Sequence, residues 1–256
     1  MQEVTILKSN NLLLGKRALI TGATGDLGRS IAEVFAENGA DLVLCLRSKS
    51  TDFDNFCESL TTKFGTNIRV EYLDLADQVS ISNLVSKLGG EDVQIDVLVN
   101  NAGIPFGATI LMTKASDLIR VFQVNYFSQV SLTQGIVKLM VRRKQGVVIN
   151  VSSVSGIRTD PGTLAYGGSK AALIHSTKVM AAEFAIYGVR VNAIAPEMIE
   201  TQMLQEMSPS ARENAIDRSN FDRPALPVEI AKIALFLASE MSNHISGEII
   251  SNSGGK

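Results

Sequence analysis

A tyrosine and a lysine four residues apart are the side chains of this sequence best suited to acid–base chemistry. They are Tyr166 and Lys170, and Ser153 precedes the tyrosine by 13 residues. A helix places positions four apart on one face, and a nearby ammonium lowers the high pKa of a phenol. Such a tyrosine can exchange a proton with a substrate oxygen that the serine holds by a hydrogen bond. The three residues therefore predict the reduction of a carbonyl or the oxidation of an alcohol.

A glycine-rich turn near the N-terminus predicts a site for a dinucleotide. The segment Thr21-Gly22-Ala23-Thr24-Gly25-Asp26-Leu27-Gly28 joins an expected strand to an expected helix. Glycines at such a turn let the backbone approach a pyrophosphate, whose charge is favoured at the helix N-terminus. The alternative is a tight turn without a ligand. Its place in the first strand–helix unit of the chain favours the dinucleotide.

The end of the second expected strand indicates which dinucleotide binds. An acidic residue usually stands here to accept a hydrogen bond from the 2′-hydroxyl of NAD, but this chain has Leu46-Arg47-Ser48-Lys49. Arg47 can pair with a 2′-phosphate through its fork of donors. The alternative is a pair of solvated surface cations. We expect NADP(H) rather than NAD(H).

Short apolar strands alternate with amphipathic helices along the chain, and these elements must position the residues above. The expected strands are Arg17–Thr21, Leu42–Leu46, Ile68–Tyr72, Ile95–Val99, Val147–Val151, Val189–Ile194 and Glu248–Ser251. The expected helices occupy about 28–38, 52–64, 77–88, 114–143, 164–187 and 227–239. This alternation predicts a single doubly wound α/β domain over residues 1–256, with a mostly parallel seven-stranded sheet and helices on both faces. Residues 197–227 are polar and weakly periodic, and we expect a substrate lid there.

Composition argues against several other classes of protein. Lys and Arg total 24 and Asp and Glu total 26, so the net charge of −2 provides no broad positive field for nucleic acid. Two cysteines and two histidines are too few, and too poorly spaced, for a disulfide framework or a metal site. No apolar run reaches the ~20 residues of a membrane span, and residues 1–11 do not resemble a signal peptide. We expect a cytoplasmic protein without a membrane partner.

Taken together, these motifs resemble the short-chain dehydrogenase/reductase family. Asn100-Asn101-Ala102-Gly103 follows the fourth expected strand, so the glycine turn, this motif, the serine and Tyr-x-x-x-Lys occur in the family's order. The resemblance implies a Rossmann-like fold and an NADP-dependent oxidoreductase acting on CH–OH groups. It implies catalytic roles for Asn125, Ser153, Tyr166 and Lys170. Asn125 matches the asparagine that supports a water relay to the lysine, and the lysine also holds the nicotinamide ribose.

The same resemblance implies a set of cofactor contacts. Asp74 is similar to an aspartate that contacts adenine, and Ile199 and Thr201 are similar to residues that meet the carboxamide and phosphates. The whole implied set is Gly22, Thr24, Gly25, Leu27, Gly28, Arg47, Asp74, Leu75, Asn101, Ala102, Gly103, Tyr166, Lys170, Pro196, Ile199 and Thr201.

Two positions depart from the family's usual pattern for chains of this size. Asp26 stands where the usual turn has glycine, and Glu197 follows Pro196 where glycine is usual. A carboxylate facing a pyrophosphate would repel it, so Asp26 must point away or weaken cofactor binding. These departures are the support for an alternative of another class, a catalytically silent regulator that binds the cofactor.

Within the family, the C-terminal third is most similar to the 3-oxoacyl-acyl carrier protein reductase group. The matching segments are Arg223-Pro224, Ile245-Ser246-Gly247-Glu248 and Asn252-Ser253-Gly254-Gly255. The resemblance implies an acyl thioester substrate, an acyl carrier protein as a candidate partner, and a homotetramer built through the helices at 114–143 and 164–187. A reductase of another ketone, or a sugar or polyol dehydrogenase, fits the same motifs.

A basic cluster bears on the carrier-protein partner. Arg142-Arg143-Lys144 is expected beside the site, where it can receive an acidic carrier protein. A solvated helix end is the alternative. Tyr187 stands where the reductase group often has a second basic residue.

Overall fold

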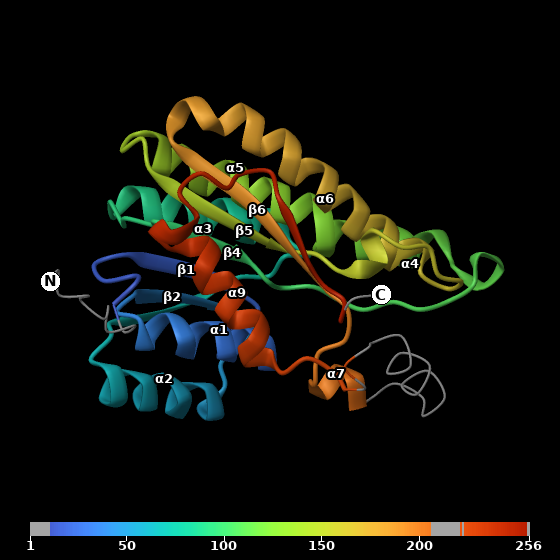
Figure 1. The fold of residues 1–256 in the computed structure, drawn as a ribbon, viewed down its shortest axis with the longest axis horizontal. Helices are drawn as coiled ribbons and strands as arrows, with labels where there is room; N and C mark the ends of the chain where they lie inside the picture. Colours follow the sequence, from blue (N-terminus) through green and yellow to red (C-terminus); the bar gives the residue numbers. More distant parts are fainter. Residues whose placement is uncertain (1–10, 206–220, 222, 255–256) are drawn as a thin grey trace, which may run out of the picture.

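Seven parallel strands form one sheet in the order β3-β2-β1-β4-β5-β6-β7 (Figure 1). The computed structural model describes residues 11–205, 221 and 223–254. The strands are β1 (Arg17–Thr21), β2 (Asp41–Leu46), β3 (Ile68–Tyr72), β4 (Val97–Asn100), β5 (Gly146–Val151), β6 (Val189–Pro196) and β7 (Ile249–Asn252). The central strands are almost wholly apolar because both faces of the sheet are covered. The predicted doubly wound α/β fold is confirmed.

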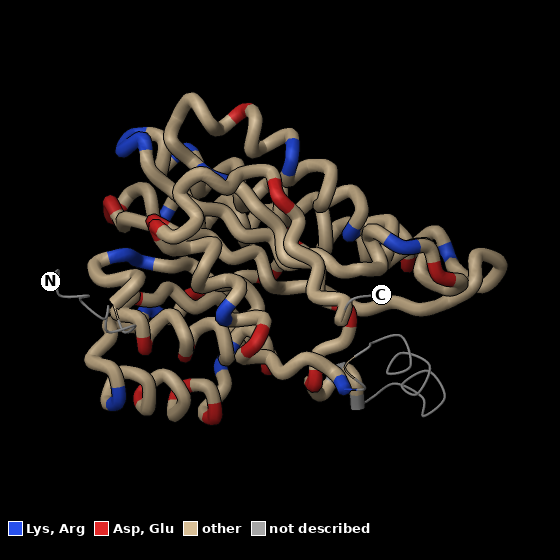
Figure 2. Tube along the Cα trace, viewed as in Figure 1, with Lys and Arg blue, Asp and Glu red and all other residues tan. Residues whose placement is uncertain are grey.

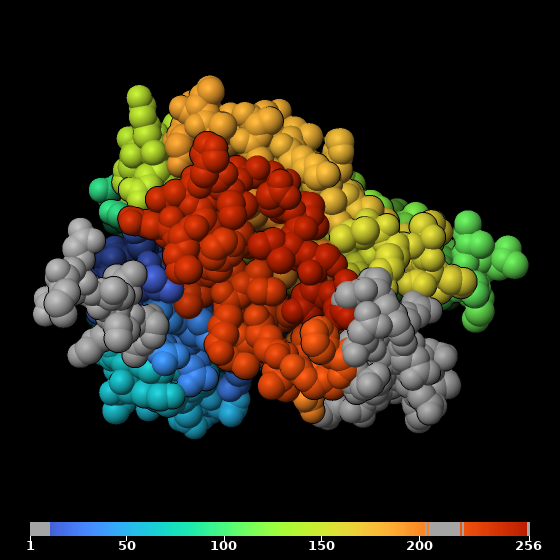
Figure 3. All heavy atoms as spheres, viewed as in Figure 1, coloured from blue at the N-terminus to red at the C-terminus, as the bar shows by residue number. Residues whose placement is uncertain are grey.

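Helices pack on both faces of the sheet and divide its core in two. One layer contains α1 (Asp26–Glu37), α2 (Thr51–Phe64) and α9 (Pro227–Ala238), and the other contains α3 (Gln78–Gly90), α5 (Ser128–Val141) and α6 (Leu164–Phe184). Because side chains alternate along a strand, Ile20 faces the first layer and Leu19 faces the second. On the face drawn in Figure 3, the red part of the chain, which includes α9 and β7, lies between α6 and α1.

The long helix expected at 114–143 is divided by a π-helical turn. It consists of α4 (Ala115–Phe122), a π turn at Gln123–Phe127 (η2) and α5. A π turn adds one residue to a helix without ending it, and such turns are frequent at functional sites. The apolar periodicity continues through the turn, so it gave no sign of this insertion.

Two element boundaries differ from the sequence prediction in ways that concern the site. β4 (Val97–Asn100) starts and ends later than the expected Ile95–Val99. It ends later because Asn100 still pairs with Asn150 in the ladder to β5. α1 begins at Asp26 rather than at position 28. The predicted substrate lid at 197–227 lies largely outside the described residues, although a short helix, α7 (Gln202–Gln205), stands near its start.

The sheet has its topological switch between β1 and β4, which are neighbours although the chain visits β2 and β3 between them. In open α/β sheets the ligand crevice lies outside the carboxyl ends of the strands at such a point. Figure 2 shows acidic and basic residues interspersed along the chain. Within the described residues, no helix combines the length and apolar character needed to cross a membrane.

Candidate active site

Ser153, Tyr166 and Lys170 meet at the carboxyl end of β5. Ser153 precedes a short 3-10 turn, η3 (Val154–Gly156), and its Oγ accepts a hydrogen bond from the Ser155 N–H at 3.1 Å. Tyr166 and Lys170 lie in the first two turns of α6. Ser153 lies close enough to the Tyr166 side chain to lower the pKa of its phenol, and the Lys170 Nζ lies 5.9 Å from the centroid of the Tyr166 ring. The structure thus brings together the three residues that the sequence singled out.

Burial controls the protonation of this group. Lys170 is 3% exposed, its Nζ donates to the Val151 carbonyl at 2.8 Å, and burial lowers its pKa to about 8. Burial also raises the pKa of Tyr166, and the hydrogen bond with Ser153 opposes this rise in part. The expectation of a lowered phenol pKa is therefore wrong for this state, since removal of the phenol from water raises it. At neutral pH the tyrosine is protonated and can donate a proton.

Asn125 lies in the π turn and ties the loop after β4 to α6. It is fully buried; its Oδ1 accepts from the Ile104 N–H at 2.8 Å and its Nδ2 donates to the Ile104 carbonyl at 3.0 Å. The same Nδ2 reaches the Ser169 Oγ at 3.3 Å. A side chain on Gly103 would come within 3.3 Å of Asn125 and 3.5 Å of the Lys170 Nζ. Asn125 therefore fixes the wall beside Lys170, and the water relay stays a prediction.

The glycine turn fits a dinucleotide pyrophosphate. Gly22 has φ +64°, and a Cβ there would lie 2.8 Å from the Ala102 Cα, while one on Gly28 would lie 2.2 Å from the Gly22 carbonyl oxygen. The fold itself requires these two glycines. A Cβ on Gly25 would meet only the Gly22 oxygen, at 3.7 Å, so this side of the turn is open. Gly25 provides no side-chain cap for α1. The N–H groups of the first turn are therefore available to bind an anion.

Asp26 is directed toward the segment that follows β6. Its Oδ2 accepts a hydrogen bond from the backbone N–H of Gln202 at 2.7 Å, at the first residue of α7. The carboxylate is therefore engaged by a donor 176 residues away in the chain. This contact explains how an acid is accommodated at the start of α1.

Asn101 fastens the end of β4 to the glycine turn. Its Nδ2 donates to the carbonyls of Thr21 and Gly22, at 3.0 and 3.1 Å. The Thr21 Oγ1 in turn accepts from the backbone N–H groups of Asn101 and Ala102, at 3.0 and 3.1 Å. Asn101 thus ties the end of β4 to the glycine turn, and Ala102 lies against the turn itself.

The other predicted cofactor residues lie along the same edge of the sheet. Arg47 is exposed directly after β2, and none of the described residues forms an ion pair with it. Asp74 is exposed after β3, with Oδ1 accepting from the Ala76 N–H at 2.8 Å. Pro196 ends β6, and Ile199 forms a bridge with Ala225. Thr24 is exposed in the glycine turn, whereas Leu27 and Leu75 are buried in the two hydrophobic cores.

Thr201 completes the predicted set and lies beside α7. Its Oγ1 donates to the Ile199 carbonyl at 3.3 Å, and its own carbonyl accepts from the Leu204 N–H. Among residues 11–205, 221 and 223–254, no three His, Cys, Asp or Glu side chains gather into a group that could hold a metal.

A buried polar chain behind the candidate catalytic residues was not predicted. Asn100 donates from Nδ2 to the Thr133 Oγ1 and to the Asn150 Oδ1, both at 2.8 Å, and Asn150 donates to the Thr177 Oγ1 at 2.9 Å. These four residues are buried and join β4 and β5 to α5 and α6. The signal that could have revealed them is an asparagine within otherwise apolar strands, because a buried amide requires partners.

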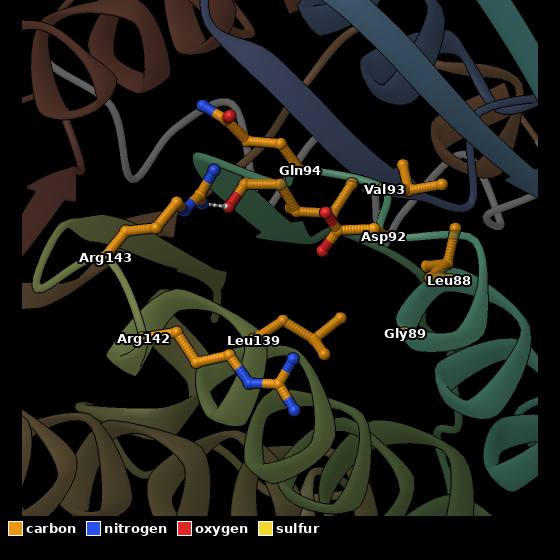
Figure 4. A pocket seen from close by; sticks show the side chains of 9 residues that line it. Leu88, Gly89, Asp92, Val93, Gln94, Leu139, Arg142 and Arg143 are labelled. Carbon is orange, nitrogen blue, oxygen red and sulfur yellow. Dashed lines mark hydrogen bonds between the residues drawn. The ribbon is translucent and has the colours of Figure 1, made fainter.

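The basic cluster lies at the opposite end of the sheet, so its predicted place beside the site is wrong. Arg143 donates to the Ile95 carbonyl at 2.6 Å, just before β4 begins. With Arg142 it lines a cavity of about 120 Å³ next to Asp92 and Gln94 (Figure 4). The reason is that α5 runs back across the sheet, so its C-terminus reaches the amino end of β5. A partner bound at this cluster would be separated from Ser153 by the length of that strand.

Comparison with known proteins finds similarity over nearly the whole chain. The family described as Enoyl-(Acyl carrier protein) reductase matches residues 22–256. The 3-oxoacyl-acyl-carrier-protein reductase FabG of Thermotoga maritima is 38% identical over 246 residues, which cover 95% of this chain and 98% of the relative.

Two solved structures are similar in fold and sequence. A protein from Agrobacterium tumefaciens, named as a gluconate dehydrogenase, has a TM-score of 0.90 and 28% identity, and the match covers 95% of this chain and 96% of that one. A protein from Beutenbergia cavernae, named as an NAD(P)-dependent gluconate 5-dehydrogenase, was solved with NADP bound at low occupancy. Its TM-score is 0.88 and its identity 28%, with coverage of 95% and 97%.

Proposed function

The chain belongs to the short-chain dehydrogenase/reductase family of oxidoreductases, and we propose that it reduces the keto group of 3-oxoacyl thioesters with NADPH. The observation that carries this proposal is the proximity of Tyr166 to Ser153, with the Nζ of the buried Lys170 5.9 Å from the centroid of the tyrosine ring. Two hydroxyls at one point bind a carbonyl oxygen, and one of them can give it a proton. The similarity to the Thermotoga reductase over nearly the whole chain supports the thioester.

In the proposed reaction, Ser153 and Tyr166 hold the substrate oxygen and the tyrosine protonates it. The nicotinamide, when bound, supplies the hydride that reduces the carbonyl carbon. The raised pKa of Tyr166 suits this direction, since the phenol holds its proton until negative charge develops on the oxygen. Lys170 stabilises the resulting phenolate and, as proposed, binds the ribose. Gly22, Gly25 and Gly28 would hold the pyrophosphate at the start of α1.

The choice of NADPH rests on the end of β2. Arg47 is exposed where an acid would favour NAD, and its guanidinium suits a 2′-phosphate. The NADP in the Beutenbergia structure is consistent with this choice. Delivery by an acyl carrier protein rests on the named relatives, because Arg142 and Arg143 lie at the far end of the sheet.

Replacement of Tyr166 by phenylalanine tests the mechanism. The ring and its packing remain, while the group that transfers the proton is removed. Turnover of an acetoacetyl thioester with NADPH should fall by about 10²–10⁴-fold, and the dissociation constant for NADPH measured by calorimetry should change little. Retention of most activity would show that the proton comes from elsewhere. A wild-type protein that binds NADPH without reducing any ketone would instead support the silent regulator.

We propose that the protein is a homotetramer, as the family resemblance implies. Large apolar side chains are exposed on the helices expected at the interfaces: Ile119 of α4 is 67% exposed, and Val179 of α6 is 40% exposed. Exposed apolar groups that lie together mark association surfaces. Light scattering after gel filtration should give four times the chain mass of 27.5 kDa.

A further inference from the structure

An ion pair joins the two segments that border Ser153. Arg158 lies in the loop between Ser153 and Tyr166, and Glu197 is the first residue after β6. Nη1 of Arg158 lies 2.8 Å from Oε1 of Glu197, and its Nη2 lies 3.5 Å from Oε2. Both terminal nitrogens of the guanidinium and both oxygens of the carboxylate therefore take part in the contact.

The backbone brings these segments to the same edge of the sheet. β5 and β6 are neighbours with Val151 opposite Ile194, and the Ser152 N–H donates to the Ile194 carbonyl at 2.7 Å. Ser153 and Glu197 therefore leave adjacent strands side by side. The Glu197 N–H donates to the Asn252 carbonyl at 3.0 Å, which anchors this residue to β7. The position of the carboxylate is thus determined by the sheet.

Burial makes this ion pair more than a surface contact. The Glu197 side chain is 11% exposed and that of Arg158 is 31% exposed. A carboxylate withdrawn from water interacts more strongly with a cation than a solvated one does. The guanidinium keeps access to the outside, and two exposed apolar side chains belong to the same stretch of chain, Ile157 next to Arg158 and Leu164 at the start of α6. Ile157 is 53% exposed and Leu164 is 48% exposed.

We infer that Glu197 is a specificity-determining residue that, by pairing with Arg158 in the loop after Ser153, makes the site select uncharged ketones over ketones that carry a carboxylate. This inference rests on the proposed function and concerns its substrate. A substrate carboxylate next to this ion pair would meet a guanidinium that already binds Glu197, and it would be repelled by the negative charge of Glu197. An acyl thioester has no charge next to its keto group, and its chain can lie against Ile157 and Leu164. Gluconate, which appears in the names of the structural relatives, does carry a carboxylate.

The test compares two ketones that differ mainly in this charge. They are the N-acetylcysteamine thioester of acetoacetate and acetoacetate itself, each assayed with NADPH. The measured quantity is the ratio of kcat/KM for the thioester to kcat/KM for the acid. Glu197→Gln should lower this ratio at least about tenfold, because the amide no longer repels the acid and no longer forms an ion pair with Arg158. Arg158→Gln should raise the ratio, because the carboxylate of Glu197 then acts alone.

Glu200→Gln is the matched control, since it removes an exposed acid three residues along the same segment. Its ratio should equal that of the wild type. If Glu197→Gln fails to fold, the opposite shift in Arg158→Gln decides the question. A wild-type ratio retained in the two variants that break the pair would overturn the inference and leave the proposed reductase intact. A wild type that reduces neither ketone would overturn the proposed function and this inference with it.

Discussion

Replacement of Lys170 by methionine should change how the stability of the protein depends on pH. The wild-type ammonium is 3% exposed, and burial lowers its pKa from 10.5 to about 8. Between these two values the unfolded chain keeps a proton that the folded protein has lost. The free energy of unfolding of the wild type therefore rises with pH through this window. Below about pH 8 both states are protonated, and the cost of burying the charge is fully present.

The size of the effect follows from the difference between the two pKa values. A lowering of 2.5 units, from 10.5 to about 8, corresponds to about 3 kcal/mol of destabilisation at low pH. Between pH 7 and pH 9.5 the wild type should regain about 2 kcal/mol of this. The hydrogen bond from Nζ to the Val151 carbonyl contributes about 1 kcal/mol. Its loss offsets part of the gain in the variant without changing the pH dependence greatly.

The assay is urea unfolding of the cofactor-free protein at several pH values from 7 to 9.5, followed by circular dichroism. Lys170→Met should be more stable than the wild type at pH 7, and this advantage should narrow by about 2 kcal/mol by pH 9.5. Ionisation of groups remote from position 170 affects both proteins alike and cancels in the difference. Lys178→Met is the matched control, because Lys178 is exposed on the same helix. Parallel stability curves for wild type and Lys170→Met would refute the burial argument.

Four further substitutions test the predicted cofactor site. Arg47→Asp should weaken NADPH binding about tenfold or more while affecting NADH little, and equal effects in calorimetry would contradict the choice of NADPH. Asp26→Asn, which removes charge but keeps an acceptor for the Gln202 N–H, should tighten NADPH binding a few-fold. Asp26→Gly also loses the contact with the Gln202 N–H, which holds the start of α7 after β6, so its KM for the ketone should rise. Unchanged KM values would mean that this contact has no part in substrate binding. Gly28→Ala should abolish cofactor binding and lower Tm by several degrees, because its Cβ would lie 2.2 Å from the Gly22 oxygen; wild-type affinity in this variant would contradict the described turn.

The sequence by itself determined those features that depend on residues close together in the chain. Apolar strands alternating with helices predict the parallel sheet, since each element's periodicity is local. The glycine turn and the spacing of Tyr166 and Lys170 are local in the same sense. From them the site edge of the sheet and three members of the candidate catalytic group could be placed without coordinates.

Tertiary structure alone decided which distant groups meet and how they titrate. The contact of Asp26 with Gln202, 176 residues away, and that of Arg158 with Glu197 depend on which strand ends adjoin. Burial of Tyr166 raised its pKa where the motif alone suggested the reverse. Hydrogen bonds and desolvation act over a few ångströms in space, and residues at that distance are brought together by packing rather than by their order in the chain.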